Sequence, residues 1–174
     1  MAINDRGDLG WFSPDPRALI PLDDRFHVSH GLRRTLDKNR FEITVDEDFE
    51  AVIRSCSKCH GATWISPEIL KSYCQLHHEG HAHSIETRLE GNLVGGLYGV
   101  HIGGAFFGES MFHRETDASK VALVALVERL RSQGFVLLDT QWMTPHLMQF
   151  GTFEIPKREY LKLLREAVAK PRVF

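Results

Sequence analysis

The chain has 174 residues, of which 43% are hydrophobic and 25% charged, and its formal net charge is −2 at pH 7. This composition predicts one domain with a substantial core, and the small net charge excludes an overall attraction to nucleic acid or to an anionic membrane. Because it has neither an apolar run of roughly 18 residues nor the apolar region of a signal peptide, we expect a cytoplasmic protein with no membrane partner.

The first part of the chain contains several prolines and glycines, which interrupt regular structure. We therefore expect an irregular segment over Gly7–Leu22, and divide the chain into an N-terminal segment, 1–22, and one folded domain, 23–174. A short helix should follow around His30–Leu36, and then a strand over Phe41–Val45.

Two helices are expected next. The first starts near Asp46 and presents an apolar face to the core. The second has Ser66 as its N-cap and Pro67 at its first position, and it ends near His78, just before Gly80.

The second half of the chain predicts a sheet with helices around it. Three strands, Ala82–Leu89, Leu93–Ile102 and Ala105–Met111, are joined by short turns that contain glycine, as in an antiparallel meander. The remaining elements are a long helix from Thr116 or Asp117 to Gly134, a strand over Phe135–Gln141, a short helix over Pro145–Phe150, a strand over Phe153–Ile155, and a terminal helix from Pro156 or Lys157. Together they predict an α+β fold with a mostly antiparallel central sheet flanked by helices.

Two segments have the residue types of metal sites. Cys56-Ser57-Lys58-Cys59-His60 matches the pattern for covalent haem attachment and half of a zinc site. Haem attachment of that type accompanies export, and zinc needs a second ligand pair, so we expect reduced thiols at a change from helix to loop. The histidines at 77, 78, 81 and 83 flank a predicted helix end, where structural roles are expected. The sequence therefore predicts no metal and no cofactor.

The strongest signal for chemistry is the end of the strand that follows the long helix. Its apolar run ends in alternating polar residues, which puts the carboxyl of Asp139 and the carboxamide of Gln141 on one face. In the preceding strand Phe107, Glu109 and Met111 share a face, so that an acidic group lies between two large apolar side chains, as in a pocket. The alternatives are polar groups that satisfy the backbone at a strand end, and a paired core glutamate.

Eight short blocks occur in a fixed order along the chain. They are Trp11–Arg17, Thr63–Ile65, Gly80–Ser84, Gly95–Val100, Phe107–Phe112, Ala118–Lys120, Asp139–Gln141 and Glu154–Pro156. In these blocks, roughly residues 11 to 165 resemble the leucyl/phenylalanyl-tRNA–protein transferases. The resemblance implies a GNAT-like acyltransferase fold, with its catalytic domain over 23–174. It also implies that leucine or phenylalanine moves from its tRNA to the N-terminal Arg or Lys of a protein, which marks that protein for degradation.

The resemblance further implies roles for individual residues. Asp139 and Gln141 would be catalytic: Gln141 orients the amine or stabilises the oxyanion, and Asp139 accepts the proton or polarises Gln141. Glu109 would face the cationic acceptor residue or hold the pair in place. The candidates for an apolar slot that holds the leucyl or phenylalanyl side chain are Met111, Leu97, Leu123, Leu126 and Leu138. The candidates for stacking on the terminal adenine of the tRNA are Trp64 and Trp11. Core packing is the alternative for each leucine, and covering a core edge is the alternative for each tryptophan.

One departure from the family concerns the start of the chain. Typical members carry a further N-terminal module before the Trp-Phe-Ser-Pro block, whereas ten residues precede Trp11 here. We expect either weaker tRNA binding or a start site assigned too late.

Two rival classes of function remain. One is an acetyl-CoA-dependent GNAT enzyme, which would have a Gly-rich loop before its long helix; the segment His113–Ser119 lacks such a loop. The other is a non-catalytic module that binds basic N-termini through Glu109. We expect a monomer, and the sequence does not predict whether leucine or phenylalanine is preferred.

Overall fold

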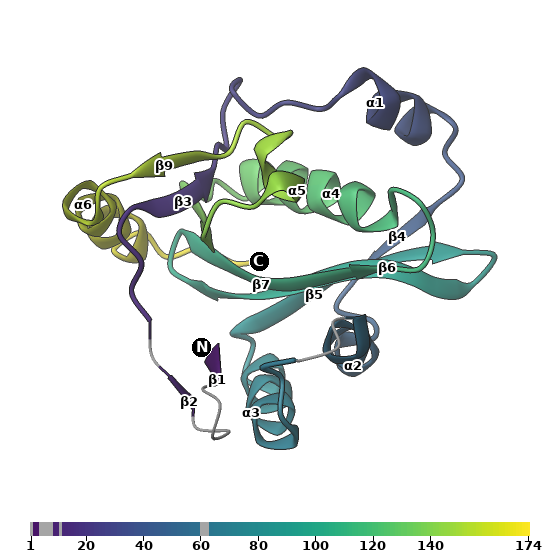
Figure 1. Ribbon diagram of the computed structural model, residues 1–174, viewed down its shortest axis with the longest axis horizontal. Coiled ribbons are helices and arrows are strands. Elements are labelled where there is room, and N and C mark those ends of the chain that lie inside the picture. Colours follow the sequence, from purple (N-terminus) through teal and green to yellow (C-terminus); the bar gives the residue numbers. More distant parts are fainter. Residues whose placement is uncertain (1, 4–8, 11, 60–62) are drawn as a thin grey trace.

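The computed structural model describes residues 2–3, 9–10, 12–59 and 63–174, which are arranged around one large sheet (Figure 1). The helices are α1 (His30–Asp37), α2 (Phe49–Cys59), α3 (Pro67–His78), α4 (Ala118–Ser132), α5 (Pro145–Met148) and α6 (Lys157–Val168). The strands are β1 (Ala2–Ile3), β2 (Leu9–Gly10), β3 (Arg17–Ile20), β4 (Glu42–Val45), β5 (Ala82–Leu89), β6 (Asn92–Ile102), β7 (Ala105–His113), β8 (Leu137–Gln141) and β9 (Phe153–Ile155).

The large sheet has seven strands in the order β4-β5-β6-β7-β8-β3-β9, and β1 and β2 pair separately. Neighbouring strands of the large sheet are antiparallel except β7 and β8, which are parallel. The predicted meander is confirmed as β5, β6 and β7, with Gly91 and Gly103 at positive φ in its two turns. The prediction of an α+β domain with a mostly antiparallel sheet is confirmed.

Two expectations for the first half of the chain are wrong. Arg17–Ile20, which lies in the segment expected to be irregular, forms β3 between β8 and β9. Its four residues are too few to show the alternation of apolar and polar residues that predicts a strand. The strands on both sides of it supply the hydrogen-bond partners that hold it in the sheet. The proposed boundary at residue 23 therefore follows a strand of the sheet. Helix α2 begins at Phe49 and not near Asp46, because Asp46 has a φ of 60° and its carboxylate accepts the main-chain N–H of Ser84.

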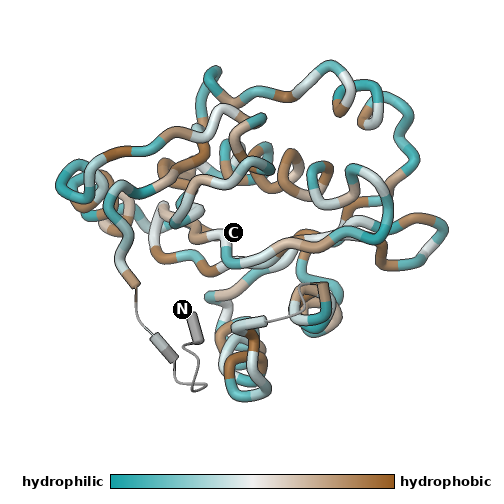
Figure 2. Tube along the Cα trace, viewed as in Figure 1, coloured by the Kyte–Doolittle hydropathy of each residue, from teal (hydrophilic) through white to brown (hydrophobic). Residues whose placement is uncertain are grey.

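Helices cover both faces of the sheet. α4 lies on one face, and α2 and α3 lie on the other (Figure 1). The largest buried cluster lies under α4 and includes Leu97, Phe106 and Leu138. In Figure 2 the tube of α4 is mostly hydrophobic, as expected for a helix buried on several sides. α6 packs against β7, β8 and β3 through Tyr160 and Ala167. Within the described residues, no helix is long and apolar enough to span a membrane.

Candidate active site

The sheet is interrupted where β7 and β8 separate. These strands pair Ala105 with Leu137, Phe106 with Leu138, and Phe107 with Asp139. Beyond these pairs both strands leave regular geometry: β7 has a bulge at Glu109, and Gln141 of β8 has a φ of 63°. Where the pairing of two strands stops, their main-chain groups are no longer hydrogen-bonded to each other.

The bulge in β7 changes the faces predicted for its side chains. The register between β6 and β7 shifts next to Gly99, which leaves Glu109 as the extra residue. Past the bulge, Met111 pairs with Leu97 and packs in the cluster under α4, whereas Phe107 packs in the cluster beside α6. The prediction that Phe107, Glu109 and Met111 share one face is wrong, because one additional residue reverses the alternation.

Glu109 is a half-buried carboxyl near Asp139. Burial raises the pKa of Glu109; a hydrogen bond with the Tyr73 hydroxyl and the charge of Arg17 oppose this rise, and the charge of Asp139 adds to it. The ring of Tyr73 meets the half-buried Trp64 edge-on, with 6.2 Å between their centroids. Trp64, Tyr73 and Glu109 thus form a continuous set from the start of α3 to the bulge. A cationic ligand would offset the cost of burying the Glu109 carboxylate.

Asp139 is 0% exposed, and its carboxylate is enclosed by hydrogen-bond donors. Arg17 donates to both oxygens, at 2.9 Å from Nε to Oδ1 and 2.7 Å from Nη2 to Oδ2. The Tyr160 hydroxyl donates to Oδ2 at 2.6 Å, and the main-chain N–H of Gln141 donates to Oδ1 at 2.8 Å. These bonds occupy the lone pairs that would take up a proton. Of the two roles predicted for Asp139, the contacts favour fixing Gln141 over accepting a proton.

Arg17 and Tyr160 contact the Asp139 carboxylate and were not among the candidate residues of the sequence analysis. The guanidinium of Arg17 lies 4.9 Å from the ring centroid of Tyr160, and its side chain is only 12% exposed. The signal that could have identified such a residue is Asp139 itself, because a buried carboxylate needs a cation. The sequence alone offers many arginines, and Arg17 lay in a segment with no predicted structure.

Gln141 is linked to Asp139 through the main chain. A bulge in the pairing of β3 with β8 puts Asp139 opposite Leu19 but Gln141 opposite Ala18, the next residue. Neighbouring residues such as Leu19 and Ala18 point to opposite faces of β3. The prediction that Asp139 and Gln141 share one face of their strand is therefore wrong, because the bulge shifts the register between them. The hydrogen bond to Asp139 instead holds Gln141 at a φ of 63°. That conformation costs a non-glycine residue about 1–2 kcal/mol, so the surroundings must fix it.

The residues predicted for an apolar slot do come together. Leu97, Leu123, Leu126 and Leu138 are buried in the cluster under α4, and the half-buried Met111 packs against them. Their burial fits core packing as well as a slot that opens when a substrate enters. Trp11, the second candidate for stacking, lies outside the described residues.

The histidines at the end of α3 have structural hydrogen bonds, as predicted. Nδ1 of His77 lies 2.9 Å from the carbonyl oxygen of Ala82, and Nδ1 of His78 lies 2.6 Å from that of Cys74. In the part of the chain that the structure describes, no group of three or more His, Cys, Asp or Glu residues could hold a metal ion. His60, of the haem-like pattern, lies outside that part.

Residues 19–165 match the family model of leucyl/phenylalanyl-tRNA protein transferase. Relatives that carry this name include the protein of Akkermansia muciniphila, which is 55% identical over 97% of this chain and 88% of its own length. The relative from Herpetosiphon aurantiacus is 54% identical over 99% of this chain and 90% of its own length. The relative from Gloeobacter violaceus is 54% identical over 100% of this chain and 89% of its own length.

Solved structures with a similar chain course are more distant. L-PGS from Bacillus licheniformis has a TM-score of 0.49 and 16% identity, over 79% of this chain and 50% of that chain. An aminoglycoside acetyltransferase from an uncultured soil metagenomic sample, solved with sisomicin, has a TM-score of 0.49 and 12% identity, over 75% of this chain and 88% of that chain.

Proposed function

Because the chain belongs to the leucyl/phenylalanyl-tRNA–protein transferase family, we propose that its two substrates meet where β7 and β8 separate. Members of this family are aminoacyltransferases that move an amino acid from aminoacyl-tRNA to the N-terminus of a protein. We further propose that the acceptors begin with Arg or Lys and that the added residue marks them for degradation. Charged tRNA occurs in the cytoplasm, and one chain supplies every group proposed below, so a cytoplasmic monomer is sufficient.

The reaction requires the enzyme mainly to position the ester and the amine. An aminoacyl ester is already activated, and an α-amino group titrates near pH ~8, so part of it is neutral at pH 7. The amine attacks the ester carbonyl, the tRNA hydroxyl leaves, and the amine loses one proton. We assign the carboxamide of Gln141 to orienting the amine or stabilising the oxyanion, and Asp139 to fixing Gln141 through its main-chain N–H.

The half-buried carboxyl of Glu109 is the observation that supports basic acceptors. Its pKa is raised by burial, so an incoming guanidinium or ammonium group would relieve an existing electrostatic cost. Glu109 lies on the bulge of β7, beside the separation from β8, where the first residue of an acceptor would come close to Gln141. A neutral N-terminal residue would lose this interaction.

The transferred amino acid and the tRNA end need their own contacts. We propose that the leucyl or phenylalanyl side chain enters between α4 and the sheet at Met111, whose flexible thioether suits both a branched and a flat side chain. Trp64, whose ring is only half-buried, is proposed to stack on the terminal adenine. It lies next to Tyr73, the partner of Glu109, so both substrates would approach one region.

One assay separates the candidate functions. The protein is incubated with labelled leucyl-tRNA, phenylalanyl-tRNA or acetyl-CoA, and with peptides that begin with Arg, Lys or Ala. We expect label from both tRNAs on the Arg and Lys peptides and none from acetyl-CoA. Label from acetyl-CoA alone would identify an acetyltransferase. Binding of the basic peptides without transfer of label would identify a recognition module.

Glu109→Gln should lower transfer to Arg-starting peptides while making the protein more stable at pH 7. A hydrogen bond to a charged group contributes about 1.5–3 kcal/mol, so we expect a loss of roughly 10- to 100-fold for basic peptides. The folded state raises the pKa of Glu109, so the ionised carboxylate destabilises the fold above that pKa, and the amide should raise Tm. Transfer rates and thermal unfolding are measured on the same samples.

The pH dependence provides a second check. As the pH falls through the raised pKa of Glu109, the ratio of Arg-peptide to Ala-peptide transfer should decline, because both peptides share the titration of the α-amine. Glu115→Gln is the matched control, since the side chain of Glu115 is 43% exposed and paired with Arg40. A constant ratio in the wild type, or equal losses in both variants, would remove Glu109 from acceptor recognition.

A further inference from the structure

The contacts proposed for the aminoacyl-tRNA lie on opposite faces of the large sheet. Trp64 and Tyr73 belong to the cluster on the face that α2 and α3 cover, and the hydrogen bond with Tyr73 places the Glu109 side chain on that face too. Met111 and the buried leucines around it lie on the other face, under α4. An aminoacyl group that is linked to an adenine on Trp64 must therefore cross the sheet before its side chain contacts Met111.

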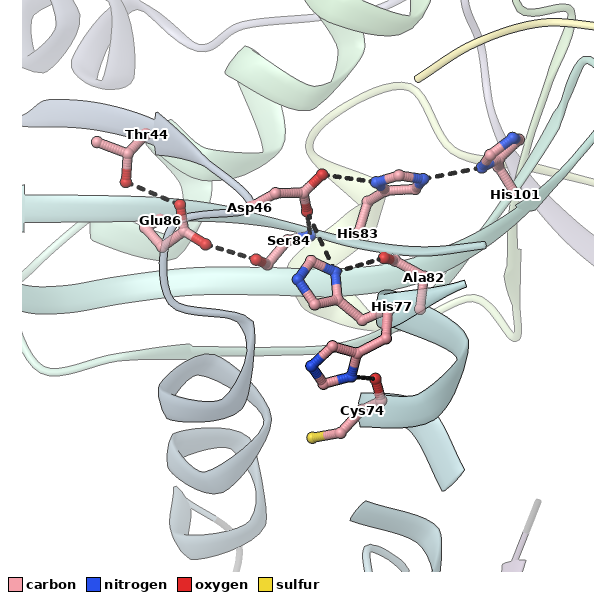
Figure 3. Close-up of polar contacts among 10 residues, drawn as sticks. Thr44, Asp46, Cys74, His77, Ala82, His83, Ser84, Glu86 and His101 are labelled. Atoms are coloured by element: carbon pink, nitrogen blue, oxygen red, sulfur yellow. Dashed lines mark hydrogen bonds and ion pairs between the residues drawn. The ribbon is translucent and has the colours of Figure 1, made fainter. Parts of the chain in front are cut away.

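Paired strands close most of the sheet to such a crossing. Strands in a hydrogen-bonded pair are only about 4.8 Å apart, which leaves no room for a side chain between them. β5 pairs with β6 along its whole length. On β4 and β5 the buried polar side chains also bond to one another, since Glu86 accepts from Ser84 and Thr44 (Figure 3). The pairing of β7 with β8, by contrast, stops at Phe107 and Asp139, and we call the region beyond this last pair the gap.

Gly108 is the first residue of β7 in the gap. Side chains alternate between the two faces of a strand, and Phe106 packs under α4 whereas Phe107 packs beside α6. A Cβ on Gly108 would therefore point to the side of α4. Among the described residues, this Cβ would have one neighbour within 4 Å, the carbonyl oxygen of Asp139 at 3.6 Å, which is an ordinary van der Waals contact. The described side chains thus leave space beside Gly108 on the face that carries the proposed slot.

Neither the backbone nor the packing of the described residues requires glycine at position 108. Its φ is not in the left-handed region, and the extra residue of the bulge is Glu109. At Gly96 and Gly99 of the neighbouring β6, in contrast, a Cβ would collide with main-chain carbonyl oxygens. Glycine inside a strand lowers stability relative to alanine, and it often marks a place where a ligand comes close to the main chain. The space beside Gly108 therefore suggests a ligand.

We propose that Gly108 is a specificity-determining residue, which leaves a passage for the leucyl or phenylalanyl side chain from the gap to the space under α4. The ester carbonyl stays beside Gln141 while the side chain passes Gly108 and contacts Met111. A side chain at position 108 would occupy the space that the transferred side chain needs. This inference rests on the proposed function, because it assigns a path to the same substrate.

Gly108→Ala is the decisive variant, because it adds one methyl group where the protein itself has room for it. The donors are three samples of one tRNA that carry leucine, phenylalanine or alanine, and the acceptor is an Arg-starting peptide. We expect transfer of leucine and phenylalanine to fall by about 10- to 200-fold, the range for one methylene group in an apolar pocket. Transfer of alanine, whose methyl group stops short of the passage, should be slow but equal in the variant and the wild type.

The ratio of leucine transfer to alanine transfer is the readout, because a general loss of structure or of tRNA binding would lower both rates. Thermal unfolding is measured on the same samples, and Tm of Gly108→Ala should equal or exceed that of the wild type. Gly31→Ala is the matched control, since Gly31 lies on α1 and a Cβ there also meets no described atom within 4 Å. This control should keep the wild-type ratio.

Each result decides whether the passage exists. An unchanged ratio in Gly108→Ala overturns the passage but leaves the proposed function intact. A lower Tm, or an equal loss of alanine transfer, also overturns it, since packing would then account for the glycine. If the wild type transfers none of the three amino acids, the proposed function fails, and the passage fails with it.

Discussion

Replacing Arg17 with methionine should abolish measurable transfer and lower the free energy of unfolding by about 3–5 kcal/mol, the range for removing one partner of a buried ion pair. Asp139 is 0% exposed, and Arg17 is the cation that pairs with it. Methionine fills much of the same space but leaves the carboxylate with only the Tyr160 hydroxyl and the Gln141 N–H. The remaining charge must take up a proton or draw in water, and either change would move Gln141.

Urea unfolding and transfer from labelled leucyl-tRNA are the measurements for this variant. Arg25→Met is the matched control, since Arg25 pairs with Asp23 at 2.7 Å but both side chains are more than half exposed, at 65% and 56%. An exposed pair of this kind contributes about 0–1 kcal/mol, and its loss should leave transfer unchanged. Arg17→Lys keeps the charge without the bidentate fork and should fall between the wild type and Arg17→Met.

A combined variant separates the stabilising role of the ion pair from its role in positioning. In Arg17→Met/Asp139→Leu/Tyr160→Phe, the three polar side chains of the buried set are replaced by apolar groups of similar size, which is often neutral for stability. We expect stability close to that of the wild type, with transfer still absent because nothing holds the N–H of Gln141. If this variant transfers at the wild-type rate, the positioning role of Asp139 is wrong.

The regular elements of this fold could be predicted because their signals are local. Ser66 and Pro67 mark the start of α3, and the Gly91 and Gly103 turns mark the meander. The bulges have no such signal, since they depend on which strands are paired. At Gly99 a Cβ would collide with the carbonyl oxygen of Phe107 and the ring of Phe106, so the close approach of β6 and β7 at the bulge requires glycine there.

The sequence could name candidate residues for the site, but it could not predict their arrangement. The pattern of polar residues points to Asp139, Gln141 and Glu109. Their faces follow from register shifts of one residue, which alternation cannot reveal. Arg17 is 122 positions from Asp139 in the sequence, and only the insertion of β3 next to β8 brings the two together. Contacts of this range depend on the order of strands in the sheet.

Replacing Gln141 with glycine should reduce transfer by about 10²- to 10³-fold without loss of stability, the range for removing one oxyanion-type donor. Glycine is the informative substitution because Gln141 has a φ of 63°. Glycine adopts this conformation without the strain of a Cβ, so its main-chain N–H can still donate to Asp139. The variant therefore removes the carboxamide and little else.

Two further variants at position 141 decide what the side chain contributes. Alanine also lacks the carboxamide but has the same left-handed backbone strain as the native glutamine. Gln141→Ala should therefore lose as much transfer as Gln141→Gly, keep a stability near that of the wild type, and be about 1–2 kcal/mol less stable than Gln141→Gly. Asparagine tolerates this backbone and keeps the amide on a shorter stem, so it should retain part of the rate. Single-turnover rates with saturating aminoacyl-tRNA isolate the chemical step from binding. Full single-turnover activity in Gln141→Gly would mean that the main chain at this position, fixed by Asp139 and Arg17, is sufficient without the carboxamide.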